Sequence, residues 1–486
     1  MGTQLSPVTA GAGPMTSVVE RDSIPAQASS TVATAFAIAF VAWLPIQTTV
    51  ALVAYEYAGV GLTIAEGILL LKDVVVAGAI LLLLARHYRQ LGLRWYDWIA
   101  VVYVALIAVY SFVPWVLGSE LPLKAVAASA RIFLMPVELY ALGRLLMLSR
   151  ANLGIVVKAF LAVSAVAAGA TLLAFVFTSP DFWTTVLDLP RFIREVQGYP
   201  AAVNLTNISV LTQYGDGEAI LRATWPFTHP VGTGHYFVLP FGIALAGTYA
   251  AWERGVRSRE LALWAGLVIL FVGTLIGPIS RGSWIAAAIA ALACGIAFRR
   301  VLVTATGIAV VALFIVLVPP FSLAVWGAVG ATDPSTVAHG GAIQSGVTSY
   351  LQAPLGLGMG QADHPGAAYG GDESAAVGEN LYLALLVSVG PLGTLAFFGW
   401  LVGMIGTLLA AWRGSRPWLA VALLACVLGY LVSASTASPL MRFTTAASFW
   451  LLLGMVVASV NAWQPHVGRL RVFRRSVDSP QSNPAT

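Results

Sequence analysis

The sequence consists largely of apolar runs of about 20 residues, each long enough to cross the hydrocarbon core of a bilayer as a helix. Hydrophobic residues make up 58% of the 486 residues, and charged residues make up only 10%. The sequence therefore predicts an all-α polytopic membrane protein with about 12 transmembrane helices, centred near Val41, Val76, Leu106, Pro136, Ala168, Phe237, Val268, Ala288, Val310, Leu395, Leu424 and Leu453.

Basic residues gather in alternate connections between these runs. Cytoplasmic loops of membrane proteins are enriched in lysine and arginine, so the basic connections are assigned to the cytoplasm and both termini are expected there. The net charge of +5 follows from this asymmetry and indicates no nucleic-acid partner. The assigned residues are Arg21, Arg86, Arg89, Arg94, Arg144, Arg150, Lys158, Arg254, Arg257, Arg259, Arg299, Arg300, Arg413, Arg416, Arg469, Arg471, Arg474 and Arg475.

Composition divides the chain into three parts. Residues 1–30 form a polar tail rich in Ser, Thr, Gly and Pro, which we expect to be uncleaved, disordered and cytoplasmic. Residues 31–463 form a single transmembrane domain, and residues 464–486 form a basic cytoplasmic tail. Cys294 and Cys426 both lie in apolar runs, so they are expected to be small core residues and not a disulfide or metal pair.

The remaining eight basic residues are not explained by this orientation: Lys72, Lys124, Arg131, Arg191, Arg194, Arg222, Arg281 and Arg442. Charge within or beside a bilayer is costly and usually functional. One interpretation is that several of them converge on an outward cavity that binds a polyanion. The alternative is structural, with Lys72 paired to Asp73, Arg131 paired to Glu138, and arginines at helix ends reaching the headgroups.

Two long connections are expected on the outward side, over residues 179–222 and 319–380. The first contains Phe182 and Trp183, which either anchor it among headgroups or belong to an amphipathic stretch over a lipid-binding cleft. The second spans 62 residues without a lysine or arginine. Ordered connections of this length are often lids or binding loops.

Three passages resemble the O-antigen ligase and O-antigen polymerase superfamily of integral membrane glycosyltransferases. The first, residues 222–232, reads RATWPFTHPVG and is similar to the family's arginine followed by a His/Asn-Pro turn. The second, residues 279–284, reads ISRGSW and is similar to its Ser-Arg-Gly signature. The third joins residues 354–360, PLGLGMG, to residues 379–386, ENLYLALL, and residues 390–393, GPLG.

The resemblance implies that Arg222 and Arg281 correspond to the family's essential arginines, which hold the diphosphate of the donor. A guanidinium is permanently charged and bidentate, which suits that ligand. Lys72 and Arg131 are expected to assist in binding. Gly358, between Gly356 and Gly360, would permit close approach of a ligand, and Asn380 belongs to the same third passage.

The chain departs from the family at Glu379, where ligases present a histidine. A carboxylate can also accept a hydroxyl proton as general base, and the alternative is that Glu379 caps the following helix. This departure favours a polymerase over a ligase. His229 and His364 are reserve candidates in the site.

The resemblance implies an inverting glycosyltransferase that moves a glycan from a polyprenyl diphosphate carrier to an acceptor hydroxyl, with polymerisation of repeat units as the first expectation. Its partners would be the lipid-linked glycan, a glycan or lipid acceptor, membrane lipids and other polysaccharide-assembly proteins. No cofactor or metal is expected, and the location would be the bacterial cytoplasmic membrane with an outward-facing active site. Alternatives are ligase-type transfer to lipid or protein, and a transporter or flippase of lipid-linked glycans.

Overall fold

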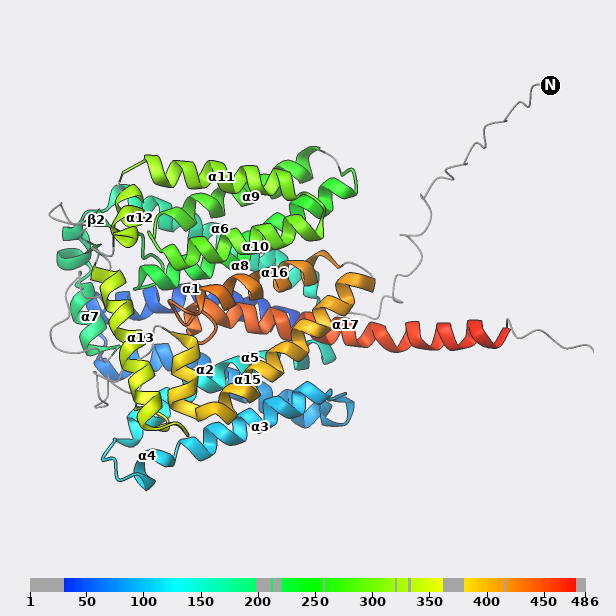
Figure 1. Cartoon of the computed structure of the whole chain (residues 1–486), viewed down its shortest axis with the longest axis horizontal. Coiled ribbons are helices and arrows are strands. Elements are labelled where there is room, and N and C mark those ends of the chain that lie inside the picture. Colours follow the sequence, from blue (N-terminus) through cyan, green and yellow to red (C-terminus); the bar gives the residue numbers. More distant parts are fainter. Residues whose placement is uncertain are drawn as a thin grey trace, which may run out of the picture.

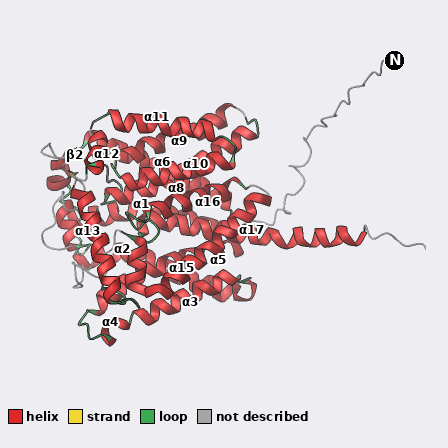
Figure 2. Ribbon diagram, in the orientation of Figure 1, coloured by secondary structure: helices red, strands yellow, loops and turns green. Residues whose placement is uncertain are grey.

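The computed structural model describes residues 30–197, 211–212, 220–256, 258–319, 321–330, 334–361, 380–414 and 417–477. Figures 1 and 2 show a bundle of helices that run side by side. The helices are α1 (Thr31–Glu56), α2 (Leu62–His87), α3 (Trp95–Tyr110), α4 (Val113–Val116), α5 (Leu123–Leu148), α6 (Leu153–Phe177), α7 (Leu189–Glu195), α8 (Pro230–Glu253), α9 (Ser258–Ile276), α10 (Arg281–Ala297), α11 (Val301–Leu317), α12 (Phe321–Val329), α13 (Pro334–Gln352), α15 (Leu381–Gly414), α16 (Trp418–Ser433) and α17 (Phe443–Val477).

Three short elements complete the described chain. A 3₁₀ turn covers Tyr88–Gln90, and a π-helical turn covers Phe182–Val186. The strands β1 (Leu211–Thr212) and β2 (Ile220–Leu221) pair antiparallel, with Leu211 opposite Leu221.

Eight helices of the described chain are long and apolar enough to cross a membrane: α1, α2, α3, α5, α6, α9, α15 and α17. A ninth span results if α11 and α12, which meet at 87°, are taken as one broken helix. The protein is therefore an all-α multi-pass membrane protein, as the apolar runs predict. The predicted centres near Phe237, Ala288 and Leu424 lie in α8, α10 and α16, which are outside this set.

Glycines allow the central helices to approach closely. A Cβ on Gly429 of α16 would lie 2.3 Å from the carbonyl oxygen of Ala286 in α10. Between α5 and α17, a Cβ on Gly454 would lie 2.2 Å from the carbonyl oxygen of Tyr140, and a Cβ on Gly143 would lie 2.2 Å from that of Leu451. Small residues at helix contacts are typical of membrane bundles, where close backbone packing replaces the hydrophobic drive of water.

The two ends of the bundle differ. Ser30, just before α1, donates its backbone N–H to the carbonyl of Arg150 at 3.0 Å, so α1 begins where α5 ends. The far end of α17 lies on that same side, whereas α7, α12 and α13 gather at the opposite end (Figure 1). We call this opposite end the α7 end. Residues 319–380, expected as a long loop, are helical over most of their described part, in α12 and α13.

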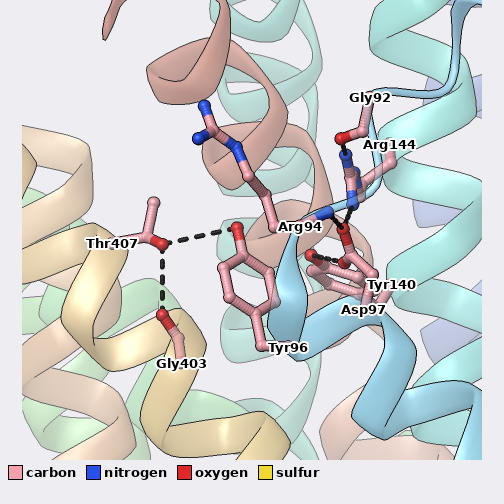
Figure 3. A network of polar contacts seen from close by, with 8 residues as sticks. All are labelled: Gly92, Arg94, Tyr96, Asp97, Tyr140, Arg144, Gly403 and Thr407. Carbon is pink, nitrogen blue, oxygen red and sulfur yellow. Dashed lines mark hydrogen bonds and ion pairs between the residues drawn. The ribbon is translucent and has the colours of Figure 1, made fainter.

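At the other end of the bundle, Arg144 forms a buried polar network with α3 (Figure 3). Its guanidinium is ion-paired with Asp97 and donates to the Gly92 carbonyl at 3.0 Å. Asp97 also accepts from the Tyr140 hydroxyl at 2.9 Å and from the backbone N–H of Arg94 at 2.7 Å. Arg144, assigned from sequence to a cytoplasmic connection, therefore lies at the buried end of a helix and links α5 to the start of α3.

Helices α2 and α5 are joined by two ion pairs that have the same separation in sequence. Glu66 pairs with Lys124 at 3.4 Å and Asp73 pairs with Arg131 at 3.3 Å, each pair 58 residues apart. Because both pairs follow the same order along the two helices, the helices run in the same direction and meet every seven residues, as in a coiled coil. The alternative pair of Arg131 with Glu138 is not among the ion pairs of the described residues, where Arg131 pairs with Asp73.

The short helix α7 is held on the end of α1 by charge. Glu195 accepts a hydrogen bond from the Tyr55 hydroxyl, and Arg191 pairs with Glu195 at 3.2 Å and with Glu56 at 3.5 Å. Leu189 and Phe192 are buried beneath these contacts. Helix α7 therefore packs on the bundle through one apolar face. Whether this segment anchors among headgroups or covers a lipid-binding cleft stays a prediction.

The docking of α7 should depend on pH. The hydrogen bond from Tyr55, with the contacts from Arg194 and Arg191, lowers the pKa of Glu195 from its ordinary 4.5. Stabilisation is therefore present above pH 4.5 and is lost as pH falls through the lowered pKa. We expect hydrogen exchange in residues 189–196, corrected for intrinsic rate, to rise as pH falls below 4.5 and through the lowered pKa of Glu195. Glu195→Gln should show fast exchange at every pH, and an unchanged profile in that variant would contradict the assignment.

Candidate functional site

Arg222 is anchored to the turn that precedes α10. It is 7% exposed, and its Nε donates to the carbonyl of Pro278 at 2.7 Å while Nη2 donates to the carbonyl of Ile279 at 3.1 Å. The backbone N–H of Ala223 donates to the carbonyl of Gly277 at 3.1 Å. Two of the passages that carry the family resemblance, around residues 222 and 281, are therefore bound directly to each other.

Arg281 is the first residue of α10, and its Nη1 donates to the carbonyl of Ala324 in α12 at 3.3 Å. The turn before it is tight, since Ile279 has a positive φ of 49°. Ser283 closes the first turn of the helix by donating to the Ser280 carbonyl at 2.8 Å. This geometry places the Arg281 guanidinium beside a helix N-terminus, where backbone N–H groups also favour an anion.

Asn380 joins the third passage to the same region. Its Oδ1 accepts from the backbone N–H groups of Tyr382 and Leu383, which makes it the N-cap of α15. Its Nδ2 donates to the carbonyl of Ser435 at 3.0 Å, just beyond α16. The next residue, Thr436, faces Gly282, because a Cβ on Gly282 would lie 3.1 Å from Thr436 Oγ1.

These contacts define a group of side chains that we call the helix-end cluster: Arg222, His235, Arg281, Asn380, Thr436 and Arg442. Its members lie just after β2, in α8, at the start of α10, just before α15 and in the break between α16 and α17. His235 adjoins Gly282, whose Cβ would lie 3.4 Å from His235 Cε1, and the charge of Arg442 acts on the same ring. Sequence segments more than 200 residues apart thus adjoin one another, and these segments carry three arginines and one histidine.

Lys72 adjoins the cluster through Phe443, and Arg131 is linked to Lys72 through Asp73. The Lys72 ammonium lies 4.5 Å from the centre of the Phe443 ring, and Phe443 follows Arg442 directly. Lys72 is 7% exposed and also pairs with Asp73 at 3.4 Å, and the Asp73 carboxylate is shared with Arg131. The local ion pair expected for Lys72 is confirmed, and ligand binding by Lys72 and Arg131 stays a prediction.

Gly358 packs closely against other residues of the protein. Its φ is +94°, and a Cβ there would lie 2.5 Å from Pro114 Cδ and 2.9 Å from the carbonyl oxygen of Tyr110. The neighbouring backbone is held by hydrogen bonds from Leu357 N–H to the Val387 carbonyl and from Met359 N–H to the Tyr110 carbonyl. Helix α15 is interrupted by non-helical backbone at Gly390. The glycines therefore let this segment pack between α3 and the part of α15 around that interruption, and their contact with a ligand stays a prediction.

Gly358→Ala should destabilise the protein, because alanine would need a left-handed backbone costing about 1–3 kcal/mol and would collide with Pro114. We expect a clearly lower thermal unfolding temperature in detergent. The matched control is Gly406→Ala, which lies within α15 with no atom near its Cβ position and should be neutral or slightly stabilising. Equal unfolding temperatures for the two variants would contradict this role for Gly358.

The structure describes only some of the other expected site residues. His229 is the N-cap residue of α8, and its carbonyl accepts from the Thr233 hydroxyl at 3.1 Å. Glu379 and His364 lie outside the described residues. Glu379 precedes Asn380 in sequence, so the described part of the chain resumes in the cluster one residue after it. In the described part of the chain, no three His, Cys, Asp or Glu residues are grouped to hold a metal ion.

Sequence reasoning missed His235, and it treated Arg442 only as one member of the basic set. The available signal was a histidine inside an apolar run, because a polar residue in a membrane span is usually there for function. No protein-family model matches this chain. No curated protein matches it either.

Proposed function

We propose that the protein is a membrane glycosyltransferase that moves a glycan from a polyprenyl diphosphate carrier to an acceptor hydroxyl, polymerising repeat units of a cell-surface polysaccharide. The observation that carries this proposal is the convergence of the three resembling passages. Arg222 donates a hydrogen bond to the turn before Arg281. Asn380 donates a hydrogen bond to the segment that faces Gly282. If the three passages resembled the family only by chance, there would be no reason for them to lie next to one another in the folded protein.

In this proposal Arg281 stabilises the diphosphate as it leaves. Preorganised donors aimed at developing charge are usually the largest single catalytic contribution. Arg222 adds its charge and holds the Pro278 and Ile279 carbonyls, so it also fixes the start of α10. Glu379, next to the cap residue Asn380, serves as general base towards the acceptor. No cofactor is required, since the donor linkage itself supplies the free energy.

The proposal includes a topology of twelve spans. Beyond the eight helices that are long and apolar enough, it counts α8, α10 and α16 together with the bent pair of α11 and α12. The α7 end then faces the periplasm or cell exterior, and both termini lie in the cytoplasm of a bacterial cell. This placement supports the function, because lipid-linked glycans presented there can be joined without nucleotide sugars.

Reconstitution with a lipid-linked donor tests the proposal. The purified protein would be placed in vesicles with a polyprenyl-diphosphate oligosaccharide from its host, without nucleotide sugar, and the products would be resolved by size. A ladder of regularly spaced products is the expected result, and Arg281→Ala protein is the control. One discrete transfer to a lipid or protein acceptor would instead indicate a ligase. Unchanged donor, with folded protein and verified substrate, would favour a transporter or flippase.

A further inference from the structure

Glu138 is an acidic residue well inside a membrane-spanning helix. It belongs to α5, which is long and apolar enough to cross a membrane. The nearer end of that helix is Leu148, about 15 Å away at a rise of about 1.5 Å per residue. A charge at such a depth is costly unless a partner of opposite charge compensates it.

The described part of the chain supplies no such partner. Glu138 has no hydrogen bond and no ion pair to any described residue. The two ion pairs between α2 and α5 join residues 58 apart, and the same separation sets Ile80 opposite Glu138. Leu134 and Leu142, one turn away on either side of Glu138, are also apolar. The third position of the series therefore holds an acid among aliphatic side chains.

The charged groups around Glu138 are engaged with one another. Helices α1, α2, α3 and α17 pack against α5. Asp73 and Arg131 are the charged groups that act on Glu138, and they pair with each other at 3.3 Å. Residues 443–460 of α17 include no ionisable side chain. The other ionisable groups on these helices are Lys72 paired with Asp73, Glu66 with Lys124, Asp97 with Arg144, Glu56 with Arg191, the terminal Arg86 and His87 of α2, and the uncharged Tyr55, Tyr96, Tyr103, Tyr110 and Tyr140.

We propose that Glu138 is a proton-binding site within the membrane, a carboxylic acid that is uncharged at neutral pH. The bound proton removes the charge, and with it the cost of an unpaired carboxylate at this depth. Loss of the proton would add a second carboxylate near that of Asp73, so uptake and release change the charge balance between α2 and α5. The side chain is partly exposed, which gives protons and small apolar reagents access to it. This site does not depend on the proposed glycan transfer.

Dicyclohexylcarbodiimide tests the site, because this apolar reagent enters bilayers and reacts with protonated carboxyl groups. The acid adds across one C=N bond: its oxygen bonds to the central carbon and its proton passes to a nitrogen. The adduct then rearranges to a stable N-acylurea without a leaving group. Full-length protein in lipid vesicles would be treated at neutral pH and cleaved with trypsin. Cleavage after Arg131 and Arg144 releases residues 132–144, in which Glu138 is the only acidic side chain, and mass spectrometry measures the labelled fraction.

Asp73 is the matched control, because it has two basic partners. Cleavage after Lys72 and Arg86 releases residues 73–86, in which Asp73 is the only acidic side chain. We expect Glu138 to be labelled at least roughly tenfold more than Asp73, since an ordinary carboxyl with a pKa of about 4 is almost fully ionised at neutral pH. The labelling of Glu138 should fall as pH rises. Equal labelling of the two residues overturns the proposal.

Infrared spectroscopy gives a second measurement that needs no reagent. A protonated carboxyl has a C=O stretching band distinct from the bands of a carboxylate, and subtracting the spectrum of Glu138→Gln isolates the contribution of Glu138. Glutamine has the shape of the protonated acid, so the variant should unfold at the wild-type temperature; Glu138→Leu serves for the subtraction if it does not fold. The band at neutral pH supports the proposal even where the reagent fails to react. Its absence overturns the proposal whatever the labelling.

Discussion

Replacing Arg281 by alanine should lower kcat/KM for glycan transfer roughly 10²–10³-fold, the usual loss when one preorganised donor to developing charge is removed. Arg281→Lys keeps the charge but loses the planar fork, so we expect it to restore only a small part of the activity. Product formation from a defined lipid-linked oligosaccharide, measured at several donor concentrations, checks both variants.

The control for this prediction is Arg254→Ala, at the C-terminal end of α8 and away from the cluster. Arg254 is largely exposed and pairs with Glu260 at 3.4 Å, so its loss should leave transfer close to the wild-type rate. Near-normal activity of Arg281→Lys would count against the bidentate role. Near-normal activity of Arg281→Ala would remove Arg281 from the site altogether.

Replacing Arg144 by alanine should lower the free energy of unfolding by roughly 3–5 kcal/mol, because it leaves the Asp97 carboxylate buried without its partner. The side chains of Arg144 and Asp97 are 10% and 6% exposed, so water cannot compensate the charge. Denaturation of the protein in mixed micelles, followed by the loss of helical signal, provides the measurement.

A double variant separates the charge from the packing. Asp97→Asn with Arg144→Met removes both charges and retains an acceptor for the Tyr140 hydroxyl, so it should recover most of the lost stability. If Arg144→Ala alone costs less than about 1 kcal/mol, the pair behaves like an exposed one and the network has no structural role.

The membrane class and the placement of helices follow from sequence because apolar length is a strong signal. Each predicted centre lies in a helix, since a bilayer leaves a long apolar run few alternatives. The helices α12 and α13 within the expected loop were not predictable in this way. Helix α12 is an apolar stretch of only nine residues, and α13 mixes small, polar and apolar residues without a clear helical pattern. Helix α12 also contacts α10 through the hydrogen bond from Arg281 to Ala324.

The candidate site was predictable only where a residue belongs to a recognisable passage. Arg222, Arg281 and Asn380 were found by resemblance, and the structure adds that they meet. The partners of Arg222 are backbone carbonyls at Pro278 and Ile279, which no residue pattern encodes. His235 escaped notice because its neighbours Gly282 and Thr436 are brought to it only by the packing of helices that are distant in sequence.

The ion pairs between α2 and α5 determine which movements the bundle permits. Sliding α2 by seven residues one way would set Glu66 against Arg131 but bring Asp73 against Glu138, two acidic residues inside the membrane. Sliding it the other way would pair Asp73 with Lys124 and leave Arg131 opposite Ile80. Each step leaves charge uncompensated at membrane depth, which is costly. Helices α2 and α5 should therefore move as one rigid unit, and any change of shape of the bundle should occur at other helix interfaces.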